Sequence, residues 1–260
     1  MRLLCLNLWG GRKDKLLFDY LKQQAKSVDI FCFQEVFDSQ SGPTGHHGAH
    51  PHLYSELQRL LANFESVYGP TYTGWIDKEK VNFEVSEGQA IFVKKDYAVL
   101  GKGSVYIYGD EKTIITDDFK NEPKNLLYTK LAIAGQELLV VNPHGKWYPG
   151  DKLDTPERLE ESQTIINFLK SFIGPKILCG DFNLMPDTES IAIIEKSGLR
   201  NLITEFKITN TRNEISWRRY RNKQRFADYI FTSPEVRAKN LEVPYNLVAD
   251  HLPLILDFEL

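Results

Sequence analysis

Short apolar runs alternate along this chain with longer stretches whose apolar residues recur at helical spacing. Runs of this length, bounded by Gly, Pro, Asn or Asp, predict strands, and the longer stretches predict amphipathic helices. Strands are expected at residues 2–8, 29–35, 65–74, 89–94, 97–107, 113–116, 126–133, 137–143, 176–180, 226–232, 236–243 and 253–259. Helices are expected at residues 14–27, 52–63, 155–171 and 187–196. This mixture favours an α/β fold of two packed sheets with helices outside them.

The composition predicts one compact domain over residues 1–260. A chain of 260 residues with 42% hydrophobic residues can bury a substantial core. The first residues run directly into a strand, and no apolar run approaches the roughly 20 residues that cross a bilayer. Cys5, Cys32 and Cys179 are odd in number and lie inside apolar runs, which argues against a disulfide framework and fits a reducing compartment. We therefore expect a cytoplasmic protein.

The run from Gly180 to Asn183 is the most informative segment for chemistry. It follows the apolar run 176–179 directly, and we expect the Gly to allow a tight turn after a buried strand. Asp181 and Asn183 are two positions apart and would face the same side of an extended segment. A carboxylate and an amide at one point can orient a water and contact the oxyanion that it attacks. The structural alternative is a turn rich in Asp and Asn at the end of a strand.

Five other short apolar segments also run into polar residues. These residues are Asn7, Glu35, the pair Asn142 and His144, Asp228, and the pair Asp250 and His251. One polar residue at a strand end usually belongs to a turn, but active sites gather where several strand ends meet. The oxygen-rich set favours Mg²⁺, with Mn²⁺ as a second possibility, because hard cations prefer carboxylate and amide oxygens. The two histidines could donate hydrogen bonds to an anion or transfer protons.

Together these motifs resemble the endonuclease/exonuclease/phosphatase superfamily. They occur in the order and approximate spacing of that superfamily, from Arg2 to Leu260. The segments that carry the resemblance are Leu6-Asn7-Leu8-Trp9, Phe33-Gln34-Glu35, Asn142-Pro143-His144, Gly180-Asp181-Phe182-Asn183, Asp228-Tyr229-Ile230 and Ala249-Asp250-His251. The resemblance implies a deoxyribonuclease I-like fold, a four-layer α/β sandwich of two packed mixed β-sheets flanked by helices.

The resemblance also implies a role for each motif residue. Glu35 would be the principal metal ligand, with Asn7 and Asp250 near the metal directly or through water. Asp181 would orient or deprotonate the attacking water or protonate the leaving oxygen, and Asn183 would hydrogen-bond the scissile phosphate. His251, paired with Asp228, would contact the phosphate, since a carboxylate stabilises a protonated imidazole. His144 would stabilise the transition state.

Two positions distinguish branches of the superfamily. Abasic-site endonucleases have a tyrosine at the position of His144 and a tryptophan beside the Asp-Tyr motif, where this chain has Arg225-Phe226-Ala227. The chain therefore looks more like the histidine-containing branches, which include deoxyribonucleases, deadenylases, tyrosyl-DNA phosphodiesterases, sphingomyelinases and inositol phosphatases.

Two segments and three aromatic residues could determine the substrate. Residues 217–225 interleave cations with aromatic residues, and Arg218, Arg219 and Arg221 could bind phosphates there. Trp147 and Tyr148 could add aromatic walls, as could Trp9, for which a core position is at least as good an interpretation. The loop 41–52 contains His46, His47, His50 and His52. It could contact the substrate or hold an accessory metal, but we favour a solvated loop because the histidines lack regular ligand spacing.

Charge and composition narrow the substrate classes. A net charge of −3 argues against tight non-specific binding to long duplexes. A long apolar or amphipathic insertion for gripping a bilayer is also missing, so membrane insertion is not expected. We predict a Mg²⁺-dependent phosphodiesterase that acts on DNA or RNA, with nucleic acid as its partner and no obligate protein partner. The alternatives are an enzyme for a small or lipid-derived phosphate and a non-catalytic scaffold.

Overall fold

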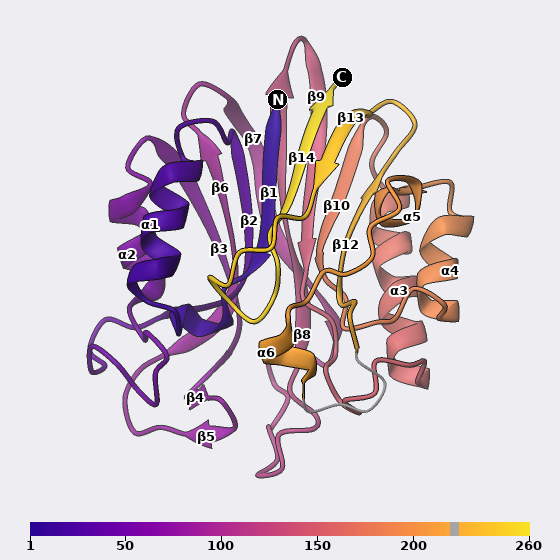
Figure 1. The fold of residues 1–260 in the computed structure, drawn as a ribbon. Helices are drawn as coiled ribbons and strands as arrows, with labels where there is room; N and C mark the ends of the chain where they lie inside the picture. Colours follow the sequence, from indigo (N-terminus) through magenta and orange to yellow (C-terminus); the bar gives the residue numbers. More distant parts are fainter. Residues whose placement is uncertain (219–223) are drawn as a thin grey trace.

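Two six-stranded sheets pack face to face in the computed structural model, which describes residues 1–218 and 224–260 (Figure 1). The first sheet has the order β13-β14-β1-β2-β6-β3, with β1 (Arg2–Asn7), β2 (Ile30–Asp38), β3 (Phe64–Thr73), β6 (Ser86–Lys94), β13 (Arg237–Glu242) and β14 (Leu254–Glu259). The second has the order β11-β12-β10-β9-β8-β7, with β7 (Ala98–Tyr108), β8 (Lys124–Ile133), β9 (Gln136–Pro143), β10 (Lys176–Asp181), β11 (Arg200–Asn201) and β12 (Asp228–Thr232).

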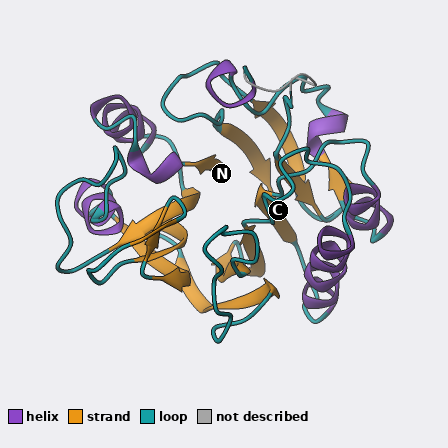
Figure 2. Cartoon of the chain, turned by 90° about the horizontal axis from the view of Figure 1, so that it is seen from below, coloured by secondary structure: helices purple, strands orange, loops and turns teal. Residues whose placement is uncertain are grey.

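Helices cover the outer faces of both sheets. The helices α1 (Lys15–Gln24) and α2 (Leu53–Leu60) lie against the first sheet. The helices α3 (Pro156–Lys170), α4 (Glu189–Lys196) and α5 (Leu202–Glu205) lie against the second. In Figure 2 helices stand at both flanks with the strands between them, which confirms the four-layer α/β sandwich. None of the helices in the described ranges combines the length and apolarity that a membrane crossing needs.

The central strands are apolar on both faces because each face meets a different layer. In β1, Leu3 and Cys5 belong to the core shared by the two sheets, whereas Leu4 and Leu6 belong to the core under α1 and α2. Burial on both faces explains why these strands read as continuous apolar runs. The three cysteines are free and buried, and Cys5 pairs with Cys32 in the register of β1 and β2.

The predicted strand at residues 113–116 is wrong. These residues lie in the loop between β7 and β8, where the Asn121 side chain accepts from the backbone N–H of Thr116 at 2.8 Å and donates to the carbonyl of Ile114 at 2.9 Å. A side chain here takes up the backbone groups that a strand partner would need.

Several short elements were not predicted: β4 (Trp75–Ile76), β5 (Glu79–Lys80), β11, α5, α6 (Glu214–Trp217) and the 3-10 turn η1 (Trp9–Gly11). Elements of two to four residues are too short to carry a period.

Candidate active site

The predicted site residues converge at one end of the two sheets. Asn7 ends β1, Asp181 ends β10, and His144 directly follows β9. Asp228 begins β12, which runs antiparallel to β10 and pairs Asp228 with Asp181. The start of an antiparallel strand meets the end of its neighbour, so distant parts of the sequence supply one site.

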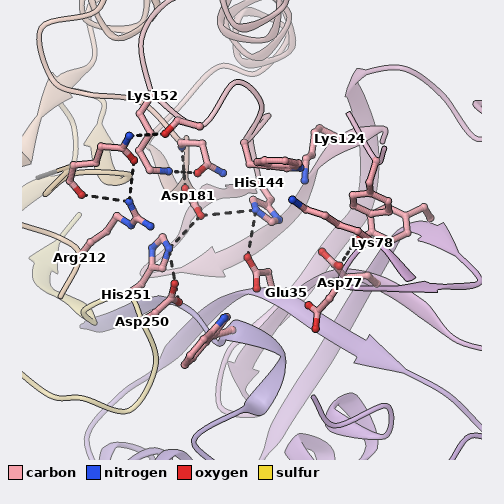
Figure 3. A pocket seen from close by; sticks show the side chains of 18 residues that line it. Glu35, Asp77, Lys78, Lys124, His144, Lys152, Asp181, Arg212, Asp250 and His251 are labelled. Atoms are coloured by element: carbon pink, nitrogen blue, oxygen red, sulfur yellow. Dashed lines mark hydrogen bonds and ion pairs between the residues drawn. The ribbon is translucent and has the colours of Figure 1, made fainter. Parts of the chain in front are cut away.

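A pocket of about 260 Å³ opens between these strand ends (Figure 3). Its lining includes the predicted residues Glu35, His144, Trp147, Asp181, Asn183, Asp250 and His251. It also includes Trp9 and several residues that the sequence patterns did not single out: Tyr72, Asp77, Lys78, Glu87, Lys124, Lys152, Arg212 and Gln224.

Asp181 lies at the centre of the pocket between the two histidines. Its Oδ2 is 3.8 Å from His144 Nε2 and 3.8 Å from His251 Nε2. Burial alone would raise the pKa of Asp181, but the surrounding His251, Lys152 and His144 lower it below its usual range. Asp181 is therefore ionised at neutral pH and can accept a proton or orient a water.

Asn7 links Asp181 to Glu35. Its Nδ2 donates to Glu35 Oε1 at 2.9 Å and to Asp181 Oδ2 at 3.0 Å, while its Oδ1 accepts from the Trp9 N–H at 2.9 Å. The Trp9 contact assigns the orientation of the amide, because only the oxygen can accept. In this arrangement Asn7 positions two carboxylates, and its predicted place near a metal remains a prediction.

Glu35 reaches the pocket through an irregularity in β2. The pairing of β2 with β6 shifts register between Phe33 and Val36, and Glu35 adopts a φ of 53°. A bulge turns a side chain toward a site that a regular strand would not present. A non-glycine residue at positive φ is costly and persists where the surroundings impose it, frequently at functional sites.

Glu35 and Asp250 fit a hard cation. Burial and the nearby carboxylate of Asp250 raise the pKa of Glu35. Within residues 1–218 and 224–260, neither carboxylate forms an ion pair with a lysine or arginine. The imidazole of His144 lies 3.9 Å from Glu35, and that of His251 lies 4.0 Å from Asp250. These two neighbouring carboxylates offer only oxygen atoms as ligands and face open space. A divalent metal that keeps several of its waters binds to such a donor set. Glu35, His144 and Asp181 also bring ligand atoms within 4.8 Å of one another.

His251 is held by Asp228, as the motif suggested. The Asp228 carboxylate accepts from His251 Nδ1 at 2.8 and 2.9 Å, and both residues are buried. Burial lowers the pKa of His251, but Asp228, Asp250 and Asp181 more than offset this and raise it to about 9. His251 is therefore an imidazolium at neutral pH, with Nε2 directed into the pocket. His144 differs, because burial and Lys124 hold its pKa well below the usual range.

The turn after β10 differs from the expectation in one respect. Gly180 is not at positive φ; a Cβ there would lie 2.2 Å from the carbonyl oxygen of Pro143, so glycine is needed for close approach of β9 and β10. The reversal comes from Asn183, at φ 54°, whose N–H donates to Asp181 Oδ1 at 2.9 Å. The segment is thus a turn stabilised by an Asp side chain and also part of the pocket lining.

Lys152 is a buried pocket residue that the sequence patterns missed. Its side chain is buried, its ammonium donates to Asn183 Oδ1, and burial together with the nearby Arg212 lowers its pKa from 10.5 to about 7. A lysine in an irregular loop has no spacing that marks it as a site residue. Its position depends on Arg158 of α3, whose fully buried guanidinium donates to backbone carbonyls of the loop, those of Lys146, Trp147, Pro149 and Leu153.

Two predicted substrate residues, Tyr148 and Arg218, do not line the pocket within the described part of the chain. Tyr148 instead contacts Trp147 edge-on, with ring centroids 5.6 Å apart. Arg218 is exposed at the end of α6. Arg219 and Arg221 lie outside the described residues. Substrate contact by Arg218, Arg219 and Arg221 therefore stays a prediction. Gln224, inside the segment 217–225, and Arg212, before it, do line the pocket.

Comparison with known proteins places the chain among phosphoester hydrolases. The model of the endonuclease/exonuclease/phosphatase family matches residues 4–251. A search of curated proteins gave no match. Among solved structures, a family protein from Leptotrichia buccalis superposes with a TM-score of 0.74 at 18% identity, covering 100% of both chains. The human Nocturnin catalytic domain gives 0.71 at 19%, covering 100% of this chain and 93% of that chain. The Bacteroides thetaiotaomicron mannosyl-6-phosphatase gives 0.70 at 16%, covering 100% of both. These likenesses show the shared fold.

Proposed function

The chain belongs to the endonuclease/exonuclease/phosphatase family and is a phosphoester hydrolase, and from this premise we propose that it cleaves phosphodiester bonds of DNA or RNA with Mg²⁺. The observation that carries the proposal is the distribution of cations in the pocket. Lys152 and Arg212 lie on one side of Asp181 and His144, and Lys78 and Lys124 lie on the other (Figure 3). A phosphodiester extends in two directions from the reacting phosphorus, and cations on both sides suit the flanking phosphates of a strand.

The charges of the central residues suit in-line hydrolysis. In this proposal the ionised Asp181 accepts a proton from the attacking water. The imidazolium of His251 and the neutral imidazole of His144 donate hydrogen bonds to the phosphoryl oxygens, where negative charge develops. Asn183 is held in place by its N–H bond to Asp181, by Lys152, and by donation of its Nδ2 to the carbonyl of Gly145 at 3.0 Å. Its predicted contact with the phosphate would therefore need little reorganisation.

Glu35 and Asp250 would hold the metal. When bound, Mg²⁺ supplies Lewis-acid neutralisation of a phosphoryl oxygen. Mn²⁺ has the same preference for hard oxygen ligands and could substitute. Glu35→Gln should raise the Mg²⁺ concentration needed for half-maximal activity more than any other single pocket change. A Mg²⁺ titration that matches the unsubstituted protein would remove Glu35 as the main ligand.

A small phosphorylated molecule is the second candidate substrate. The pocket volume of about 260 Å³ is slightly below the range of about 300 to 1,000 Å³ that is usual for ligand pockets. This volume suits a single phosphorylated sugar or a lipid-derived headgroup better than a long strand. One structural neighbour is described as a mannosyl-6-phosphatase, which makes a phosphomonoester worth testing.

Model esters and labelled oligonucleotides separate these possibilities. The purified protein is incubated with Mg²⁺ and bis-p-nitrophenyl phosphate, p-nitrophenyl phosphate, and end-labelled single- and double-stranded DNA and RNA, with Asp181→Asn as the inactive control. Cleavage of the diester and of an oligonucleotide, both lost in the control, would support the proposal. Hydrolysis of the monoester alone would replace it with the phosphatase alternative.

A further inference from the structure

Two consecutive histidines and a glutamate meet at a second place, outside the catalytic pocket. His46 Nε2 lies 3.3 Å from Glu79 Oε2, and His47 Nε2 lies 3.3 Å from the same oxygen. The three ligand atoms lie within 4.8 Å of one another. We propose that His46, His47 and Glu79 form a transition-metal site for Zn²⁺ or a similar cation, independent of the catalytic metal.

The two distances to the Glu79 oxygen match a tetrahedral metal site better than direct ion pairs. Tetrahedral Zn²⁺ with bonds of about 2.0–2.1 Å places neighbouring ligand atoms about 3.3–3.4 Å apart. A direct hydrogen bond from a charged nitrogen to a carboxylate would be shorter, at about 2.7–2.9 Å. Both imidazoles stand at 3.3 Å from one oxygen. A single cation between them would satisfy all three groups.

A tight turn brings the two imidazoles to the same side. His46 and Ala49 exchange backbone hydrogen bonds of 2.9 and 2.8 Å, and His47 and Gly48 take φ values of 46° and 87°. In extended backbone, consecutive side chains would point in opposite directions. Here the ring centroids are 4.5 Å apart. The Arg12 guanidinium also donates to the carbonyl of His47 at 2.5 Å. The ligands are therefore positioned by protein contacts alone.

The ligand types favour Zn²⁺ over Mg²⁺. Imidazole nitrogen suits Zn²⁺, Cu²⁺ and Ni²⁺, whereas Mg²⁺ prefers oxygen. The His47 side chain is 70% exposed and that of Glu79 56%, so a water can reach the fourth position. Three protein ligands and one water complete a tetrahedral zinc shell.

The site would connect a hairpin that lines the catalytic pocket to a second loop. His46 and His47 belong to the loop 41–52, and Glu79 belongs to the β4–β5 hairpin (Figure 1). Asp77 and Lys78 of the same hairpin line the pocket, and Lys78 Nζ lies 3.8 Å from the centre of the Trp147 ring. A bound metal would therefore fasten the hairpin that forms one wall of the pocket to the loop.

Co²⁺ substitution tests the site directly. The protein is titrated with Co²⁺, and separately with Zn²⁺ against a chromophoric chelator, in excess Mg²⁺. We expect one Co²⁺ per chain with the intense visible absorption of four-coordinate cobalt. The double substitution His46→Ala and His47→Ala should abolish that absorption and weaken Zn²⁺ binding by about 10- to 100-fold or more, since even outer-shell changes cost this much. His50→Gln is the matched control, because His50 lies in the same loop and outside the cluster; it should bind as the unsubstituted chain does.

Two further measurements distinguish this site from the catalytic one and from misfolding. Glu35→Gln should retain the Co²⁺ absorption, and Zn²⁺ should raise the thermal unfolding midpoint of the unsubstituted chain but not that of the double variant. Circular dichroism of the double variant checks its fold. The proposal is overturned if the unsubstituted chain shows no four-coordinate Co²⁺ spectrum, if the double variant binds unchanged, or if Glu35→Gln abolishes the signal.

Discussion

Replacing Lys152 with Met should stabilise the folded chain while it removes activity. The ammonium of Lys152 is buried against Asn183, and burial together with Arg212 lowers its pKa from 10.5 to about 7. Met has a similar length and no charge, so it occupies the same space without the cost of burying an ion. Lys152 would then lower the stability of the folded chain in exchange for function.

The expected gain follows from the pKa. At about 1.4 kcal/mol per pKa unit, the difference between 10.5 and about 7 corresponds to roughly 5 kcal/mol against the charged form in the folded state. Loss of the charged hydrogen bond to Asn183 offsets about 1.5–3 kcal/mol of this. A net gain in the free energy of unfolding of about 2 kcal/mol is therefore expected near pH 7.

The pH dependence makes the test specific. Between about pH 7 and 10.5 Lys152 is protonated in the unfolded chain but not in the folded chain, so this group makes wild-type stability rise with pH. Below about pH 7 Lys152 is protonated in both states, and its contribution to stability is constant. The advantage of Lys152→Met should therefore be largest near pH 6 and shrink toward pH 9. Urea denaturation with EDTA across that range measures it. Lys102→Met, at a lysine whose side chain is 52% exposed, should show no such trend. A Met variant less stable at pH 6, or an advantage independent of pH, would refute the reasoning.

Three other substitutions test the catalytic centre and its support. Asp181→Asn should reduce kcat by at least about 100-fold, since it removes the proton acceptor, while circular dichroism and substrate affinity stay unchanged; near-normal turnover would contradict its role. Asp228→Asn removes an anion that raises the pKa of His251, so the alkaline limb of the profile of kcat/KM against pH should move about 1 to 3 pH units lower; an unmoved limb would show that this imidazolium is not required. Gly180→Ala places a Cβ 2.2 Å from the Pro143 carbonyl oxygen and should lower the thermal midpoint by several degrees, on the order of 2 kcal/mol or more; an unchanged midpoint would refute the close approach.

The sequence alone was sufficient to predict the two-sheet framework and the polar residues at its strand ends. A buried strand must be apolar, so the point where polarity returns marks where the strand meets the site. Glu35, His144, Asp181, Asp228 and His251 were identified in this way, and the structure brings them together at one end of the sheets. Within a strand, side-chain direction follows from a local period of two, which can be read without knowledge of the rest of the fold.

Only the tertiary structure placed the residues that lie on loops. Lys152 enters the pocket because a loop of irregular backbone is held by Arg158, and Lys78 enters because a short hairpin folds over the rim. His46 and Glu79 are 33 residues apart in the chain and meet only through the turn at residues 46–49. The path of a loop is determined by contacts with partners far away in the sequence, and no local period encodes those contacts. The convergence of the polar residues at the strand ends could therefore be predicted from the sequence. The positions of the cations around them depended on the packing of the whole molecule.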